Sequence, residues 1–94
     1  MKNGENIMAI KVEVFSTNSC PHCPSAIEAA QVAKDKLGDA IDVEVIKIDE
    51  SGENRQRAID YQIMAVPTIV VDGEVAFIGA PHDFELIEKL ESLL

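Results

Sequence analysis

Two segments of the chain, residues 7–15 and 41–48, are rich in β-branched residues and lie on either side of a stretch with helical spacing. β-branched side chains favour extended backbone, so both segments are predicted to be strands. The stretch between them ends at Gly38 and carries small or apolar residues every three or four positions: Ala26, Ala30, Ala33 and Leu37. A strand, a helix and a strand in this order form a right-handed crossover, so the two strands are predicted to run parallel.

The third and fourth predicted strands, residues 67–71 and 74–78, are joined by Asp72-Gly73. Both positions of this dipeptide favour positive φ, which a two-residue hairpin turn requires. The hairpin adds an antiparallel strand to the parallel pair. The predicted fold is therefore α/β, with a four-stranded mixed sheet in the order strand, helix, strand, helix, strand, strand, helix.

Two further helices complete this order. Ser51 can cap a short helix that ends near Tyr61. The last segment, residues 82–94, carries apolar residues at the spacing of one helix face: Phe84, Ile87, Leu90 and Leu94, with Leu86 and Leu93 beside them. A chain of 94 residues is the size of one domain, and we expect residues 8–94 to form it after a flexible leader at residues 1–7.

Charge and hydropathy exclude several classes of function. The formal net charge is −9, which argues against a nucleic-acid partner because phosphate binding needs clustered Lys and Arg. No segment approaches the roughly 20 apolar residues of a membrane-spanning helix, and no signal peptide is visible. We therefore expect a cytoplasmic protein, where a lone cysteine pair is more often catalytic or metal-binding than a permanent cross-link.

The two cysteines, Cys20 and Cys23, follow the first strand at the point where the chain turns helical, from Pro21 or Pro24. Reacting groups in open α/β sheets gather at the carboxyl ends of strands. The start of a helix also has unpaired N–H groups and a positive dipole end, so we expect a lowered pKa for the Cys20 thiol. Cys23 can reach Cys20 and is expected to be the more buried thiol.

The residues between and after the cysteines modify this site. Pro21 suits the first position of a helix, where a missing N–H costs nothing. Pro24 would then stand at the fourth position, remove the bond to the Cys20 carbonyl and make the first turn slightly irregular. A protonated His22 near the sulfur would stabilise the thiolate, and the alternative is a solvent-facing side chain.

A metal site is the alternative interpretation of the cysteine pair. Structural zinc needs four ligands, and the Cys and His side chains of the whole chain are four: Cys20, His22, Cys23 and the distant His82. Neighbouring His22 and Cys23 do not splay easily into a tetrahedron with Cys20. We therefore favour a redox pair without metal or bound cofactor, over zinc or a cluster bridged between two chains.

With its elements in this order, the chain resembles the thioredoxin/glutaredoxin superfamily over almost its whole length, and small archaeal glutaredoxin-like thioredoxins most closely. The motifs that carry the resemblance are CPHC, residues 20–23, and Val66-Pro67-Thr68. The resemblance implies a thioredoxin-like fold and a thiol–disulfide oxidoreductase. It also implies that Cys20 is the nucleophile and that Cys23 resolves the mixed disulfide.

The same resemblance implies a substrate-binding surface beside the cysteines. The peptide bond before Pro67 is expected to be cis, and the Val66 backbone to pair with a strand of the substrate. Gly79 would keep this surface low for an incoming protein, and its alternative role is the turn before the last helix. We expect Pro21 and His22 to tune the active-site loop.

The chain departs from the family in three respects. A buried aspartate and a lysine that assist proton transfer at the resolving cysteine are replaced by Val14 and Val45. Ser19 replaces the tryptophan that commonly precedes the first cysteine. Thr17 and Gly79-Ala80 stand where glutaredoxins often have a lysine and a double glycine, so the signs of glutathione binding are weak.

The resemblance implies a reductase of protein disulfides, acting as a monomer, whose Cys20–Cys23 couple is restored by an external reductase or a small thiol. The Pro-His dipeptide also occurs in a periplasmic disulfide oxidase, but the additional helical domain of that oxidase does not fit into 94 residues. A disulfide oxidase or isomerase stays an alternative. A redox-sensing module that docks to a basic partner is the alternative from another class.

Overall fold

The sheet is the centre of the molecule in the computed structural model, which describes residues 9–94. Within this range one sheet has the order β3-β2-β4-β5, made of β2 (Ile10–Ser16), β3 (Ile41–Lys47), β4 (Thr68–Val71) and β5 (Glu74–Ile78). β2 runs parallel to β3 and antiparallel to β4, and β4 runs antiparallel to β5. The predicted four-stranded mixed sheet is confirmed, whereas the predicted leader and the start of the first predicted strand lie outside the described residues.

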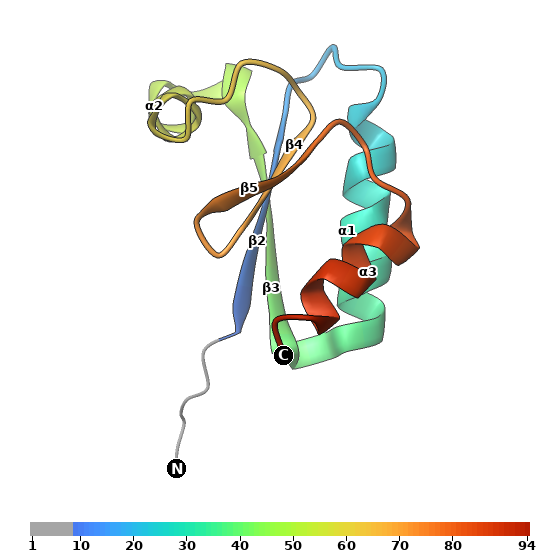
Figure 1. Cartoon of the computed structure of the whole chain (residues 1–94). Coiled ribbons are helices and arrows are strands. Elements are labelled where there is room, and N and C mark those ends of the chain that lie inside the picture. Colours follow the sequence, from blue (N-terminus) through green and yellow to red (C-terminus); the bar gives the residue numbers. More distant parts are fainter. Residues whose placement is uncertain (1–8) are drawn as a thin grey trace.

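Helices cover both faces of this sheet (Figure 1). α1 (Cys23–Leu37) and α3 (Asp83–Glu91) lie on one face, and α2 (Gly52–Asp60) lies on the other. Two short 3-10 segments, η1 (Gly38–Ala40) and η2 (Ile48–Glu50), follow α1 and β3. α1 connects the parallel strands β2 and β3, as predicted. Among residues 9–94, none of the helices has both the length and the apolar character to span a membrane.

The side chains of β2 alternate between two cores. Val12 and Val14 face α1 and α3, in a cluster that includes Ala30 and Leu90. Phe15 faces α2, in a second cluster with three further buried residues: Ile46, Ala58 and Val70. Burial of each large apolar side chain contributes about 1.5–3 kcal/mol, so both clusters hold their helices against the sheet.

The β4–β5 hairpin turns at Asp72 and Gly73, whose φ angles are 49° and 85°. Both angles are positive and β5 covers the predicted residues, so the predicted hairpin is confirmed. The Asp72 carboxylate fastens the turn to β2, because it accepts a hydrogen bond of 2.9 Å from the Lys11 backbone N–H. β4 begins at Thr68, one residue later than predicted, since Pro67 has no N–H to donate to a strand pair.

The ends of α1 and α2 agree with the signals in the sequence. α1 ends before Gly38, whose φ of 58° is unfavourable for other residues. The Ser51 hydroxyl oxygen accepts a hydrogen bond of 3.0 Å from the Asn54 backbone N–H and so caps α2, which ends before Tyr61. These two predicted helix ends are confirmed because each depends on a single local residue.

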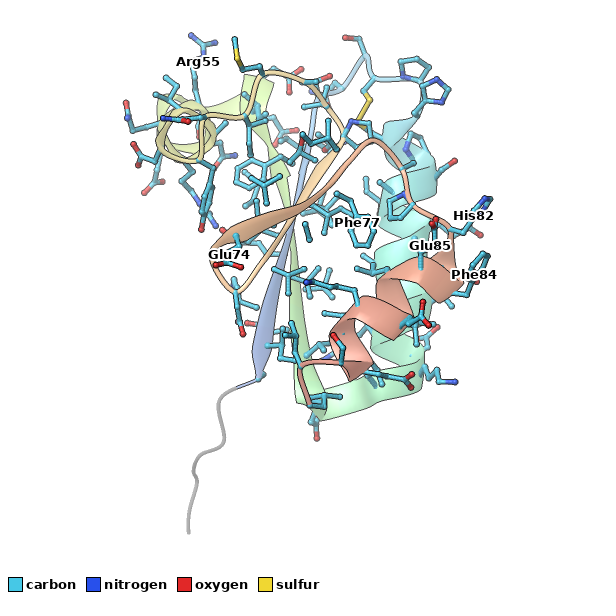
Figure 2. The ribbon with its side chains drawn as sticks, viewed as in Figure 1. Arg55, Glu74, Phe77, His82, Phe84 and Glu85 are labelled. Carbon is cyan, nitrogen blue, oxygen red and sulfur yellow. A yellow bond between two sulfur atoms is a disulfide. The ribbon has the colours of Figure 1, made fainter. Side chains whose placement is uncertain are left out.

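α3 packs on the sheet through Leu86 and Leu90, which are fully buried. The expectation of one continuous apolar face is wrong for the exposed side chains: Phe84, Leu93 and Leu94. Phe84 precedes Leu86 by two positions, or about 200° around the helix axis, and α3 ends at Glu91. Figure 2 shows Phe84 stacked beside His82, whereas Phe77 of β5 points into the layer of α1 and α3.

Glu13, in the middle of β2, is buried, although it was predicted in a strand without any special role. Its carboxylate is 2.6 Å from the Arg57 guanidinium and accepts a hydrogen bond of 2.9 Å from the Tyr61 hydroxyl. Arg57 also donates to both oxygens of Glu44, at 3.0 and 3.1 Å. Hydrogen bonds from Arg57, and then from Lys11, lower the pKa of Glu44 to about 2. The bond to Glu13, together with burial, raises the pKa of Tyr61.

Candidate active site

Cys20 and Cys23 form a disulfide, with their Cα atoms 5.4 Å apart. Cys23 is buried, at 1% exposure, whereas Cys20 is partly exposed. The prediction that Cys23 is the more buried member of the pair is confirmed. The exposure of Cys20 makes its sulfur the one that another protein can approach.

The first helix begins later than the cysteine pair suggested. The prediction that Cys20 stands at the start of this helix is wrong, because α1 begins at Cys23 with His22 as its N-cap. The backbone N–H of Ala26 donates to the His22 carbonyl at 3.4 Å. The disulfide nevertheless holds the Cys20 sulfur against Cys23, the first helical residue, and so keeps it near the positive end of the helix dipole.

The two prolines change roles with this later start. Pro21 lies in the turn before α1 and not at the first helical position, while Pro24 lies in the first turn. N–H groups of the first turn have no acceptor within the helix, so the missing N–H of Pro24 costs nothing and the predicted irregularity does not arise. Pro21 and His22 are both exposed.

The loop before Cys20 is held by a carboxylate that sequence analysis did not identify. The Asp49 carboxylate accepts a hydrogen bond of 3.0 Å from the Asn18 backbone N–H. The Cys20 N–H points back to the Thr17 carbonyl at 3.5 Å. Asp49 lies in η2, directly after β3. A polar residue that follows the carboxyl end of a strand is the feature of the sequence that could have identified it as part of the site.

The Val66-Pro67 segment forms the other side of the candidate site. Its peptide bond is cis, as the resemblance implied, and Pro67 is buried. β2 pairs with β4 in a register that matches Phe15 with Thr68, so the next pair brings Pro67 opposite Ser16 at the end of β2. The segment that contains Pro67 therefore lies where the chain leaves the sheet toward the cysteines.

Gly79 joins this segment. Its backbone N–H donates a hydrogen bond of 2.8 Å to the Pro67 carbonyl oxygen, and its φ of 102° is one that L side chains rarely adopt. The Thr68 hydroxyl donates to the Ala65 carbonyl at 2.7 Å. Val66 itself is partly exposed, and no backbone hydrogen bond to it is present within residues 9–94. Two predicted site residues, Pro67 and Gly79, are thus brought together from separate segments.

An apolar hollow lies behind the same segment, with a volume of 470 Å³. Its lining includes Tyr61 and Ile63 from the end of α2 onward, and Val75 and Ile78 from β5. Met64, at its rim, is 96% exposed, and Ile78 is 76% exposed. The surface beside Val66 is therefore apolar, although the chain as a whole is acidic.

The two valines at the departures from the family are neighbours across β2 and β3. Val14 pairs with Val45 in the parallel register. Val14 is fully buried, whereas Val45, on an edge strand, is 37% exposed. Neither can carry a proton. In the described part of the chain, no three His, Cys, Asp or Glu side chains are grouped as they would be to hold a metal ion.

The chain is similar to archaeal thioredoxins along most of its length. The family model of the thioredoxin domain matches residues 8–91. A probable thioredoxin of Methanothermobacter marburgensis is 49% identical over 83 residues, which cover 88% of this chain and 94% of the relative. A thioredoxin of Methanocaldococcus jannaschii is 44% identical over 85 residues, which cover 90% of this chain and 96% of the relative.

Solved structures agree with this relationship at the level of the fold. Thioredoxin-2 of the malaria parasite, described as a component of its protein secretion machinery, matches with a TM-score of 0.78 at 16% identity, covering 89% of this chain and 82% of that one. A thioredoxin of Halobacterium salinarum matches with a TM-score of 0.73 at 24% identity, covering 88% and 73%. The matched domain and the archaeal relatives together show that this chain belongs to the thioredoxin family.

Proposed function

We propose that this protein reduces disulfide bonds in other proteins, with Cys20 as the nucleophile and Cys23 as the resolving cysteine. The family relationship and the Cys20–Cys23 disulfide assign thiol–disulfide oxidoreductase activity to the chain. The difference in exposure between the two cysteine residues is the observation that carries the assignment of roles. Attack on a bulky protein substrate requires an accessible sulfur, and only the resolving step can use a buried one.

The reaction proceeds in two exchanges. The Cys20 thiolate attacks one sulfur of the substrate disulfide; a bond forms between Cys20 and that sulfur, and the second substrate sulfur leaves as a thiolate and takes a proton from water. Cys23 then loses its proton to water and attacks the Cys20 sulfur, and the first substrate sulfur leaves as a thiolate that also takes a proton from water. The substrate gains two electrons and two protons, and Cys20–Cys23 becomes a disulfide.

Three groups around the cysteines support this chemistry. The start of α1 stabilises a thiolate through its dipole, and a positive charge on His22, the N-cap residue between Cys20 and α1, would stabilise that thiolate further. Pro21 fixes the turn between Cys20 and α1.

The substrate is held beside the cysteines by the Val66-Pro67 segment. The free backbone groups of Val66 are suited to pair with an extended strand of the substrate, which gives affinity without a required sequence. Gly79 has no side chain, so no side chain projects at this position toward an incoming substrate. The apolar hollow and Met64 favour substrates with an apolar residue near the disulfide.

We further propose a cytoplasmic monomer whose dithiol is restored by an external reductase of the thioredoxin-reductase type or by a small thiol. A lone, reactive cysteine pair is typical of a reducing compartment. The chain has no motif for a nucleotide or flavin, so its electrons come from a partner.

Single-cysteine variants test this function. Cys20→Ser should abolish the reduction of a protein disulfide by dithiothreitol-regenerated protein, and Cys23→Ser should accumulate mixed disulfides visible by mass spectrometry. Sustained turnover in Cys20→Ser would overturn the assignment. A reduction potential near or below about −230 mV supports a reductase, and a value near about −120 mV supports the oxidase alternative instead.

A further inference from the structure

Ser16, the last residue of β2, is fully buried, and its hydroxyl oxygen has no hydrogen-bond partner. It is the single buried side-chain N or O atom without a partner in the described part of the chain. Folded proteins leave very few buried hydroxyls unpaired, because desolvation is then uncompensated. The unpaired Ser16 hydroxyl therefore needs a physical explanation.

The alternation of β2 places Ser16 on the face covered by α1. Phe15 packs against Tyr61 on the α2 side, with ring centroids 5.7 Å apart, so the next residue points to the opposite face. Val12 and Val14 on that face pack with the alanines of α1. α1 runs back along β2 from its first residue, so the start of α1 lies at the end of β2 where Ser16 is (Figure 1).

Cys23 is the first residue of α1 and is buried, and its place three positions before Ala26 puts it on the helix face that packs on β2. Ser16 and Cys23 are therefore two buried polar residues at one end of the α1–β2 contact, just beyond the last pair of β2 with β4, Phe15 with Thr68. In the disulfide the Cys23 sulfur is neutral and a weak acceptor. After reduction it becomes a thiol that ionises, and a thiolate is a strong acceptor.

We propose that the Ser16 hydroxyl donates a hydrogen bond to the Cys23 thiolate when the disulfide opens, and so positions and stabilises the resolving nucleophile. Rotation about χ1 moves the hydroxyl between staggered positions without disturbing the strand. Ser16 keeps its proton throughout, and the proton of Cys23 leaves to water. The hydroxyl thereby supplies part of the stabilisation that Val14 and Val45 cannot give.

Among residues 9–94, the charged side chains nearest to Ser16 in the chain are directed elsewhere. Glu13 and Lys11 lie on the opposite face of β2, where they pair with Arg57 and Glu44. His22, next to Cys23 in the chain, is exposed. From the other elements packed on this layer, the neighbouring groups are apolar: Ile69 of β4, and Leu86 and Leu90 of α3.

The proposal predicts opposite effects of Ser16→Ala on the two redox states. The oxidised form loses an unpaired buried hydroxyl, so its stability is unchanged or higher. The reduced form loses a bond to its thiolate, so the dithiol is disfavoured about tenfold at a pH where Cys23 is ionised, which lowers the reduction potential by about 30 mV. A purely structural role would change the stability of both forms alike.

The test uses the full chain in a Cys20→Ser background, where Cys23 is the one remaining thiol. Thiolate absorbance near 240 nm, followed against pH, gives the pKa of Cys23. Ser16→Ala should raise it by about one unit, a roughly tenfold change in ionisation, and Ser16→Thr should restore it. Val12→Ala, a cavity on the same face and strand, is the control and should leave this pKa unchanged.

An unchanged Cys23 pKa in Ser16→Ala, or equal shifts in Ser16→Ala and Val12→Ala, would overturn the proposal. The inference rests on the role of Cys23 in the proposed function, but this readout needs only the Cys23 thiol and involves no substrate turnover. A protein that fails to reduce protein disulfides would still show the shift, so the two failures are distinguishable.

Discussion

The carboxylate of Asp49 accepts a hydrogen bond of 3.0 Å from the backbone N–H of Asn18, two residues before Cys20. Asp49 belongs to η2, which follows β3, so the loop before the cysteines is tied to the neighbouring strand connection. This bond is the main constraint from outside the loop that the described residues place on it before α1 begins.

Removing the Asp49 acceptor should loosen the active-site loop. Asp49→Ala should lower the free energy of unfolding by about 1 kcal/mol and speed amide hydrogen exchange at Asn18, because a hydrogen bond to a charged group is lost at an exposed site. Denaturant unfolding and NMR exchange measure both effects. Asp39→Ala removes an exposed carboxylate from η1 and serves as the control. It should leave amide exchange at Asn18 unchanged, because Asn18 is bonded to Asp49. Equal acceleration of exchange in both variants would contradict the prediction.

Breaking the buried ion pair of β2 should destabilise the fold. Arg57→Leu leaves the Glu13 carboxylate buried without its cation, at a cost of about 3 kcal/mol. Arg55→Leu on the same helix should change stability by less than about 0.5 kcal/mol, because Arg55 is exposed and points away from the sheet (Figure 2).

The double variant Glu13→Val with Arg57→Leu separates charge burial from lost packing. It should recover much of the stability that Arg57→Leu loses, because no unpaired charge is left in the sheet. Chemical unfolding of the unchanged protein, the Arg55→Leu control, the Arg57→Leu variant and the double variant gives the comparison. Equal losses in the single and double variants would show that Arg57 acts through its packing alone.

Local signals in the sequence predicted local structure well. Asp72-Gly73 predicted the hairpin and Ser51 predicted the start of α2, because each depends on the backbone preferences of one or two residues. The cis bond before Pro67 came from the family resemblance and not from its local sequence. The cysteine pair was identified from its position after the first strand and from the family resemblance together.

Features that depend on packing were not predicted. Pro21 and Pro24 both suit a first helical turn, so sequence alone did not decide that α1 begins at Cys23. Glu13 occupies a polar position of an alternating strand, which indicates exposure until α2 is known to cover that face. Ser16 lies one residue beyond the strand predicted at residues 7–15, and its place in β2 and its lack of a partner are visible only in three dimensions.

Acid should weaken the fold through Glu44. Its pKa is lowered to about 2 by Arg57 and Lys11, below its unfolded value near 4.5, so its contribution to stability is present above pH 4.5 and is lost as pH falls toward 2. The side chain is 41% exposed and its ion pairs are screened, so the loss amounts to less than about 1 kcal/mol. Urea unfolding between pH 7 and pH 2.5 should show a shallower decline for Glu44→Gln than for the unchanged protein.

The buried and the exposed side of α3 give a matched pair of substitutions on one helix. Leu90→Ala should cost about 2–5 kcal/mol, because it opens a cavity under a side chain with no exposure at all. Phe84→Ala should cost less than about 1 kcal/mol, since Phe84 is 64% exposed and its stacking partner His82 is itself exposed. Thermal and denaturant unfolding measure both variants. A cost for Phe84→Ala equal to that for Leu90→Ala would mean that the row of apolar residues on α3 packs as the sequence spacing suggested, with Phe84 against the sheet.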